Sequence, residues 1–243
     1  ESILFHARRN HFSNWLKARA EFWLAQQLRP KRPEDFESVG QLRELLINSL
    51  QKYREIQQRG AITEFSKDTF DPQNSFARIG GGSLGGKARG LGFINTLINS
   101  YNITNKFPGV EVHVPSAIVI ATDVFDRFLA ENHLEAFALQ VDNDDELQRL
   151  FTGAPAFPPE IVHTLQEFLE ITHTPLAVRS SSLLEDSQYQ PFAGVYQTYM
   201  IANNNPDLEV RLSELLQAIK LVYASTFSKH AKDYMKATAY RLE

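Results

Sequence analysis

The sequence contains no cysteine, which excludes disulfide scaffolds and metal sites with thiolate ligands. It also lacks an apolar run of about 20 residues, the length that a helix needs to cross a bilayer, and it lacks a signal peptide. A basic surplus is missing too, since 25 basic residues stand against 29 acidic ones and the net charge is −4. Nucleic-acid-binding proteins usually concentrate basic residues on one face. We therefore expect a cytoplasmic protein that binds neither nucleic acid nor membrane.

The 243 residues are 43% hydrophobic, enough to build the core of one large domain or two small ones. The chain begins at Glu1 without a methionine and stops within a charged helical pattern, so we interpret it as a piece of a longer polypeptide. None of its histidines has a second ligand at helical spacing, and no metal-binding residue is predicted. These histidines are His6, His11, His113, His133, His163, His173 and His230.

The first 70 residues predict a helical N-terminal extension that ends in a linker. Apolar residues recur at helical spacing over 8–29 and again over about 41–58. The polar, turn-rich segment 59–75 is typical of a linker.

The rest of the chain predicts helices around a small mixed sheet, an α+β fold. A helix is expected over 87–99, with Leu91, Ile94, Leu97 and Ile98 on its apolar face. Further helices are expected after Thr122, which can act as a cap, and over 160–171. Strands are expected within 110–122, as a buried strand over 175–182, and as a half-buried strand over 194–202. A long helix with one apolar stripe follows, capped by Asn205.

The segment "RIGGGSLGGKARGLGFI", residues 78–94, comes close to a phosphate-binding loop. The motif G-x-x-x-x-G-K-[ST] fits from Gly81 to Lys87 but then meets Ala88, where Mg²⁺ needs a hydroxyl ligand. The match to this motif is therefore incomplete.

A second motif, the dinucleotide-binding G-x-G-x-x-G, is matched by Gly80, Gly82 and Gly85. It requires a hydrophobic strand directly before it, and "DPQNSFAR" predicts a poor strand. Even so, glycines let backbone N–H groups approach an anion, and a helix that starts at Lys87 points its positive end there. The alternative is a flexible loop whose basic residues face solvent.

The segment "PLAVRSSS" adds a second element suited to phosphate. Its strand delivers Arg179 followed by Ser180, Ser181 and Ser182, and a guanidinium can grip phosphoryl oxygens with two hydrogen bonds. The alternative is a structural ion pair of Arg179 with Glu185 or Asp186.

These elements resemble conserved segments of the phosphoenolpyruvate synthase and pyruvate, phosphate dikinase family. The resemblance is carried, in family order, by "GGKARGLGFI", "VPSAIVIATDVFDRFL", "LAVRSSSLLEDSQYQPFAGVYQTYM" and "VYASTFSKHAKDYMKATAY". It implies that residues 75–243 form the first lobe of an ATP-grasp nucleotide-binding domain, whose second lobe is absent from this sequence. Lys87 and Arg179 then match the catalytic residues that contact phosphate, and the nucleotide-binding set is Gly85, Gly86, Lys87, Arg179, Ser180, Ser181 and Gly194.

Enzymes of this family split ATP to AMP and pass a phosphoryl group to a histidine on another domain, then to pyruvate. The resemblance thus implies ATP and Mg²⁺ as cofactors, with the metal ligands mainly in the second lobe. It also implies a second ATP-grasp lobe and a phosphohistidine domain of the same polypeptide as partners. By itself this kinase-like fragment is expected to be inactive.

Departures from the family leave the acceptor open. Ser182 stands where the family has alanine, Ser116 and Ala117 replace Pro-Gly, and "ARG" replaces "NAS" after Lys87. One alternative is a non-catalytic nucleotide-sensing or docking module. Another is that the glycine loop and Arg179 never meet in space, so that both motifs are structural.

Overall fold

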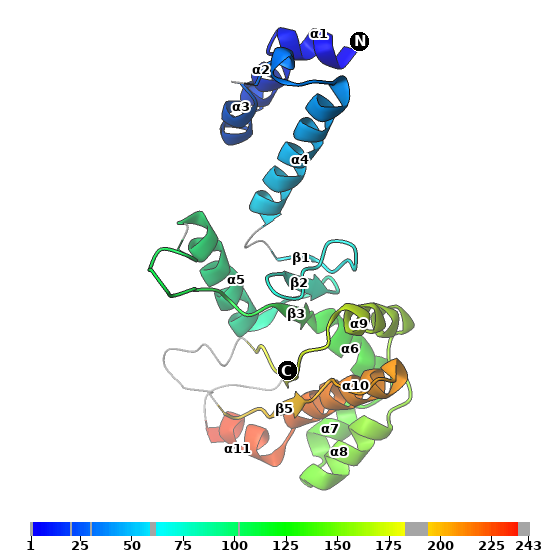
Figure 1. Ribbon diagram of the computed structural model, residues 1–243. Coiled ribbons are helices and arrows are strands. Elements are labelled where there is room, and N and C mark those ends of the chain that lie inside the picture. The colour runs from blue at the N-terminus through cyan, green and yellow to red at the C-terminus, as the bar shows by residue number, and fades with distance from the viewer. Residues whose placement is uncertain are drawn as a thin grey trace. The chain divides into compact units, whose positions relative to one another are not determined.

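The computed structural model describes residues 2–19, 21–29, 31–58, 62–101, 103–182 and 194–237. The chain forms two compact units, residues 1–59 and 60–243, whose elements are labelled in Figure 1.

The first unit is helical. Its small core consists of Leu16 of α2 and of Leu24, Ala25 and Leu28 of α3, and Leu46 of α4 packs against these residues. The elements are α1 (Ser2–Arg8), α2 (His11–Ala18), α3 (Phe22–Leu28), the 3₁₀ helix η1 (Pro33–Asp35) and α4 (Val39–Gln58).

The single helix predicted over 8–29 is wrong, because the range contains two helices, α2 and α3, which are interrupted between Ala18 and Phe22, and α2 begins only after a turn at Asn10. Asn10 adopts a left-handed conformation with φ 55° and ψ 26°, which asparagine tolerates better than most residues. The Ser13 hydroxyl donates to the Asn10 carbonyl at 3.1 Å and supports the turn. The helix predicted over 41–58 is confirmed by α4.

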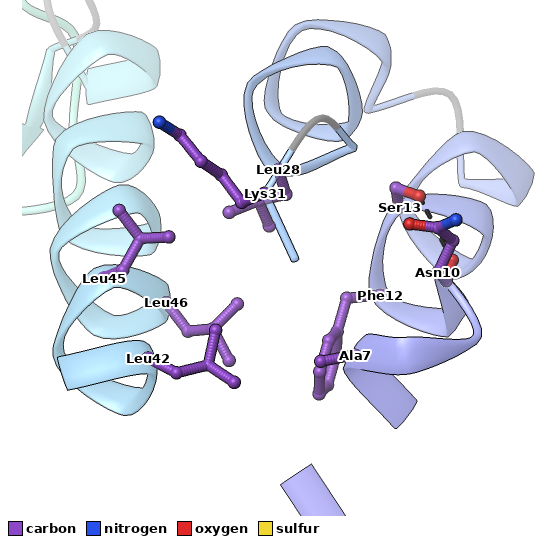
Figure 2. Close-up of a pocket in the computed structure, with 9 residues that line it drawn as sticks. All are labelled: Ala7, Asn10, Phe12, Ser13, Leu28, Lys31, Leu42, Leu45 and Leu46. Carbon is purple, nitrogen blue, oxygen red and sulfur yellow. Dashed lines mark hydrogen bonds between the residues drawn. The ribbon is translucent and has the colours of Figure 1, made fainter. Parts of the chain in front are cut away.

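A small cavity lies inside this unit, where Leu42 and Leu46 of α4 point toward Phe12 of α2 (Figure 2). Its volume of about 20 Å³ leaves room for about one water molecule. The cavity is therefore too small for a nucleotide.

The second unit contains two small sheets. One is parallel, in the order β1 (Thr63–Glu64), β2 (Phe76–Ile79), β3 (Ala117–Ile120), and the other pairs β4 (Leu176–Arg179) with β5 (Thr198–Ile201) antiparallel. The helices are α5 (Gly85–Ser100), α6 (Thr122–Glu131), α7 (Glu135–Gln140), α8 (Asp144–Gly153), α9 (Pro159–Ile171), α10 (Leu208–Ser225) and α11 (Lys229–Ala237). The α+β class is thus confirmed, but the described strands form two separate sheets instead of one mixed sheet.

Helices cover both faces of the parallel sheet. Side chains alternate between the two faces of a strand, so neighbouring residues of β2 pack in different clusters. Phe76 of β2 and Val119 of β3 pack in the cluster that contains Ala88 of α5. Ala77 and Ile79 belong instead to the main core. Figure 1 shows α5 on one side of this sheet and α6 with α9 on the other.

Part of the predicted linker belongs to this unit. Over the described residues 62–75 the chain forms β1, and Phe70 is buried. Phe65 and Phe70 meet Phe168 of α9 edge-on, with ring centroids 6.3 and 5.8 Å apart. The interpretation of this segment as a linker is therefore wrong, since aromatic side chains fasten it to the core.

The face of α5 that is buried differs from the predicted one. Leu91 and Ile94 are 40% and 46% exposed. The other two residues predicted on this face agree better, since Ile98 is buried and Leu97 is half-buried. The remaining buried positions are small or polar, namely Gly85, Gly86, Ala88, Gly92 and Asn95. Small residues let the helix backbone approach its neighbours closely. A pattern of large apolar residues therefore does not indicate this part of the buried face.

The main core lies among α6, α8, α9 and α10. Phe128 and Phe151 are fully buried there, with ring centroids 5.9 Å apart. The predicted stripe of α10 is confirmed by buried Leu212, Leu215 and Ile219. Its predicted Asn205 cap is wrong, because α10 begins at Leu208 and the Asp207 side chain accepts from the Glu209 N–H at 2.9 Å.

The strand predictions around β3 and β4 need correction. Only Ala117–Ile120 forms a strand within 110–122. In β4, Leu176 and Val178 are half-buried and Ala177 and Arg179 are exposed, so the strand is not fully buried as predicted. The half-buried strand predicted over 194–202 is confirmed by β5.

Candidate functional site

The glycine loop, residues 80–84, connects β2 directly to α5. Three of the four β2 residues are buried, so the prediction of a poor strand before the dinucleotide-type motif is wrong. Gly80 and Gly85 have φ values of 92° and 74°, which glycine adopts without strain. The helix expected from Lys87 begins two residues earlier, at Gly85.

One side of the loop is fastened to the start of α6. The Gly81 N–H donates to Asp123 Oδ2 at 2.8 Å, and the Ser83 N–H donates to Thr122 Oγ1 at 3.0 Å. The Thr122 N–H in turn donates to the Ser83 carbonyl at 3.0 Å. The prediction that Thr122 caps α6 is thus wrong: Ala121 is the N-cap residue, and the Thr122 hydroxyl binds the loop.

Two glycines of the loop make this approach possible. A Cβ on Gly80 would lie 2.6 Å from Asp123 Oδ1, and a Cβ on Gly82 would lie 2.6 Å from the Asp123 backbone nitrogen. Both distances are too short for any side chain. The anion that this part of the loop meets within the chain is therefore the Asp123 carboxylate.

The other side of the loop is fastened to the end of β4 by Ser181. Its hydroxyl donates to the Leu84 carbonyl at 2.8 Å and accepts from the Ala88 N–H at 2.9 Å. A Cβ on Gly85 would lie only 1.2 Å from the Ser181 carbonyl oxygen. The glycine loop thus meets the V-R-S-S segment at Ser181, two residues beyond Arg179.

Lys87 and Arg179, the basic residues expected to bind phosphate, belong to the two segments that meet at this junction. Lys87 is half-buried in the first turn of α5, where the partial positive charge of the helix also lies. Arg179 is exposed at the end of β4, two residues before Ser181 and opposite Thr198 in the strand register. The expected ion pair of Arg179 with residue 185 or 186 lies outside the described residues.

The remaining predicted residues differ in their surroundings. Gly86 is buried next to Gly85, and Ser180 is half-buried between Arg179 and Ser181. Gly194 is exposed and has φ 81°. A Cβ on Gly194 would meet nothing within 4 Å. The left-handed backbone conformation explains why glycine stands at position 194. The structure shows no contact between Gly194 and the glycine loop.

The pKa values of two carboxyl groups of α6, Asp123 and Asp126, are shifted in opposite directions. Burial acts to raise the pKa of Asp123, but hydrogen bonds from the Gly81, Gly82 and Val124 N–H groups outweigh it, and the pKa is lowered. One turn further along α6, burial and the neighbouring Asp123 charge raise the pKa of Asp126. Asp123 is therefore ionised at neutral pH.

A buried tyrosine lies close to the same carboxylates. The hydroxyl of Tyr223 on α10 is buried and has no hydrogen-bond partner among the described residues, and the same holds for Asp123 Oδ1. Burial, followed by the charges of Asp123 and Asp126, raises the pKa of Tyr223. Tyr223 is therefore a neutral donor near an ionised acceptor.

Sequence reasoning missed Thr122 and Asp123 as parts of this site. Both belong to a segment that resembles the family, but the resemblance assigned them no role there. Their only local signal is the polar pair directly after the apolar run of β3. Which loop they would bind is not encoded locally, because Gly81 and Asp123 are 42 residues apart.

Within the described ranges, no group of three or more His, Cys, Asp or Glu side chains is placed to hold a metal ion. None of the helices in this part of the chain combines the length and apolar character needed to cross a membrane.

A parallel strand, a glycine loop and a helix that follow one another define a class of proteins in which backbone N–H groups can receive phosphate. Residues 82–243, more than half of the chain, match the family model of the AMP/ATP-binding domain of pyruvate phosphate dikinase. The chain belongs to this family, as the four sequence segments predicted. It is thus an ATP-binding module of the phosphotransferase type.

A curated relative supports this assignment. An uncharacterized phosphotransferase of Bacillus subtilis (strain 168), YvkC, is 29% identical over 130 residues. This alignment covers 51% of the present chain but only 14% of the relative. No solved structure matches the chain.

Proposed function

We propose that residues 75–243 are the first lobe of an ATP-grasp nucleotide site in a multidomain phosphotransferase. Lys87 and Arg179 hold the phosphates of ATP, and Gly85, Gly86, Ser180 and Gly194 provide backbone and hydroxyl contacts. The observation that carries the proposal is the junction at Ser181, whose hydroxyl joins the Leu84 carbonyl to the Ala88 N–H. This junction brings the first turn of α5 and the end of β4 together.

The chemistry assigned to this lobe is to hold and orient phosphate. A lysine at a helix N-terminus and an exposed arginine both stabilise negative charge on phosphoryl oxygens. Ser181 has a different part from the one expected of it, since its hydroxyl is already engaged as donor and acceptor. We therefore assign Ser181 to holding the site together.

The described residues do not fit a Mg²⁺ site of their own, since no cluster of acidic ligands forms among them. In the proposal Mg²⁺ arrives with the nucleotide, and its protein ligands belong to a second lobe. The complete protein would phosphorylate a histidine on another domain and then pyruvate or a related acceptor. This part of the proposal rests on the family.

A calorimetric titration with Mg·ATP tests the phosphate site. Lys87→Ala and Arg179→Ala should each weaken binding about tenfold or more, because a charge-assisted hydrogen bond contributes roughly 1.5–3 kcal/mol. Lys106→Ala is the matched control: this exposed lysine follows α5 and should bind as the wild type does. Unchanged affinity in both site variants would contradict the proposal.

A wild-type chain that shows no binding calls for the same titration on a chain extended through the second lobe. Binding there would show that both lobes are needed. Absence of binding in both would instead support a non-catalytic docking module. The separate helical unit 1–59, which lies outside the family match, would suit such a role.

A further inference from the structure

The glycine loop is held in shape by Asp123, a residue outside both phosphate-suited motifs. We propose that Asp123 is a positioning residue of the nucleotide site: its carboxylate fixes the backbone of residues 80–82, and thereby the start of α5 with Lys87. This inference rests on the proposed function for its consequence in ATP binding, although the effect on the loop can be measured without ATP.

The loop is built around this carboxylate. Asp123 Oδ2 accepts from the Gly81 N–H at 2.8 Å, and the Gly82 N–H adds to the stabilisation of its charge. Gly80 and Gly82 both lack a side chain where a Cβ would lie 2.6 Å from an atom of Asp123. Gly80 thus gives room to the Asp123 carboxylate and Gly82 gives room to the Asp123 backbone, while two N–H groups stabilise the carboxylate. A loop shaped only by phosphate would not require this arrangement.

Asp123 stands on a rigid base. The next residue, Val124, is 1% exposed and belongs to the main core, as does fully buried Phe128 on the same helix. Thr122 adds two hydrogen bonds to Ser83, so α6 holds the loop at successive positions. The loop backbone is thereby held in a fixed position relative to the core.

The loop leads directly into the turn that carries Lys87. On one side Asp123 fixes residues 80–82, and on the other Ser181 fixes Leu84 and Ala88. If the Asp123 side is released, the segment between β2 and α5 still has the Thr122 and Ser181 bonds and the bond from the Gly85 N–H to Ser83 Oγ, but residues 80–82 lose the carboxylate that accepts from Gly81. Loss of the carboxylate should therefore loosen the loop and misplace Lys87 without unfolding the core.

The experiment compares Asp123→Ala, Asp123→Asn and Asp126→Ala in the full chain. Asp126 is the matched control, because it is an exposed carboxylate one turn along α6, and no contact with the loop is seen for it. Amide hydrogen exchange at Gly81 and Ser83 measures the loop, and titration with Mg·ATP measures the site. Melting temperatures show whether a variant is merely destabilised.

We expect Asp123→Ala to exchange these two amides about tenfold faster and to bind Mg·ATP about tenfold more weakly, consistent with the loss of a hydrogen bond to a charged group. Asp123→Asn, whose amide oxygen can still accept from Gly81, should lie between the wild type and Asp123→Ala. Asp126→Ala should match the wild type in both measurements. If Asp123→Ala does not fold, Asp123→Asn against Asp126→Ala makes the same comparison.

Wild-type exchange and affinity in Asp123→Ala would overturn the proposal, and so would a lower melting temperature with unchanged affinity below it. If the wild type itself binds no Mg·ATP, the proposed function of this chain is contradicted independently of the role of Asp123. Amide hydrogen exchange alone then tests whether Asp123 positions the loop. Faster exchange in Asp123→Ala but not in Asp126→Ala then supports positioning, whereas equal exchange rejects it.

Discussion

The carbonyl oxygen of Ser181 occupies the place where Gly85 would carry a side chain. A Cβ there would lie 1.2 Å from this oxygen, and Gly85 has φ 74°. The Ser181 carbonyl can approach the first residue of α5 this closely only because Gly85 has no Cβ. Among Gly80, Gly82 and Gly85, we therefore expect Gly85 to tolerate substitution least.

Gly85→Ala should therefore destabilise the second unit severely. The left-handed φ by itself costs a non-glycine residue about 1–3 kcal/mol, and the clash with the Ser181 carbonyl adds to this. We expect a total loss above about 3 kcal/mol in urea unfolding. Gly90→Ala is the matched control in the same helix, since its Cβ would meet nothing within 4 Å. It should stabilise the protein by up to about 1 kcal/mol.

Arg211 of α10 should be a second position of high sensitivity. It is 5% exposed, and its Nη1 donates to the carbonyls of Leu169 and Thr172 at 2.9 and 3.2 Å. Arg211→Met would remove this donor from the Leu169 carbonyl, and the Thr172 carbonyl would keep its bond from the Asn203 amide. We expect a loss of about 2–4 kcal/mol in unfolding free energy.

The control for this substitution is Arg149→Met, which replaces an exposed arginine of α8. It should change stability by less than about 0.5 kcal/mol. Similar losses in the two variants would show that the buried bonds of Arg211 do not stabilise the fold.

The opposite pKa shifts of Asp123 and Asp126 predict opposite effects of pH. The pKa of Asp123 is lowered in the folded state, so its stabilising contribution is complete above the unfolded pKa near 3.8 and is lost as pH falls through the folded pKa. The stability gap between wild type and Asp123→Asn should therefore shrink below about pH 4.

For Asp126 the folded pKa is raised, so the folded state binds more protons and ionisation at higher pH lowers stability. Asp126→Asn should then gain stability over the wild type as pH rises from the unfolded pKa near 3.8 through the higher folded pKa. Urea unfolding between pH 3 and 7 measures both gaps. Gaps that do not change with pH would contradict the assigned shifts.

The local pattern predicted the helices that carry large apolar residues at regular spacing. The stripe of α10 and the helix α4 follow from such periodicity. Prediction failed where short-range backbone conformation or small residues decided the outcome. The helix predicted over 8–29 begins only after Asn10, which adopts φ 55°, and is interrupted between Ala18 and Phe22. In α5, Gly92 and Asn95 are buried while Leu91 is exposed.

The phosphate-suited residues were also recognised from residue type and order, and the family match bears out the resemblance on which they were chosen. Their roles in binding stay predictions. The partners that shape the site were not recognisable in this way. Nothing in the local sequence of Asp123 shows that it lies against Gly80 and Gly82.

By itself, therefore, the sequence determined the family, the α+β class and the main helices, because residue order and hydrophobic periodicity are local properties of a chain. Only the tertiary structure decided that the loop meets Asp123 on one side and Ser181 on the other. Leu84 and Ser181 are 97 residues apart. Contacts over such separations depend on how β2, α6 and β4 pack, and the shape of the candidate site depends on that packing.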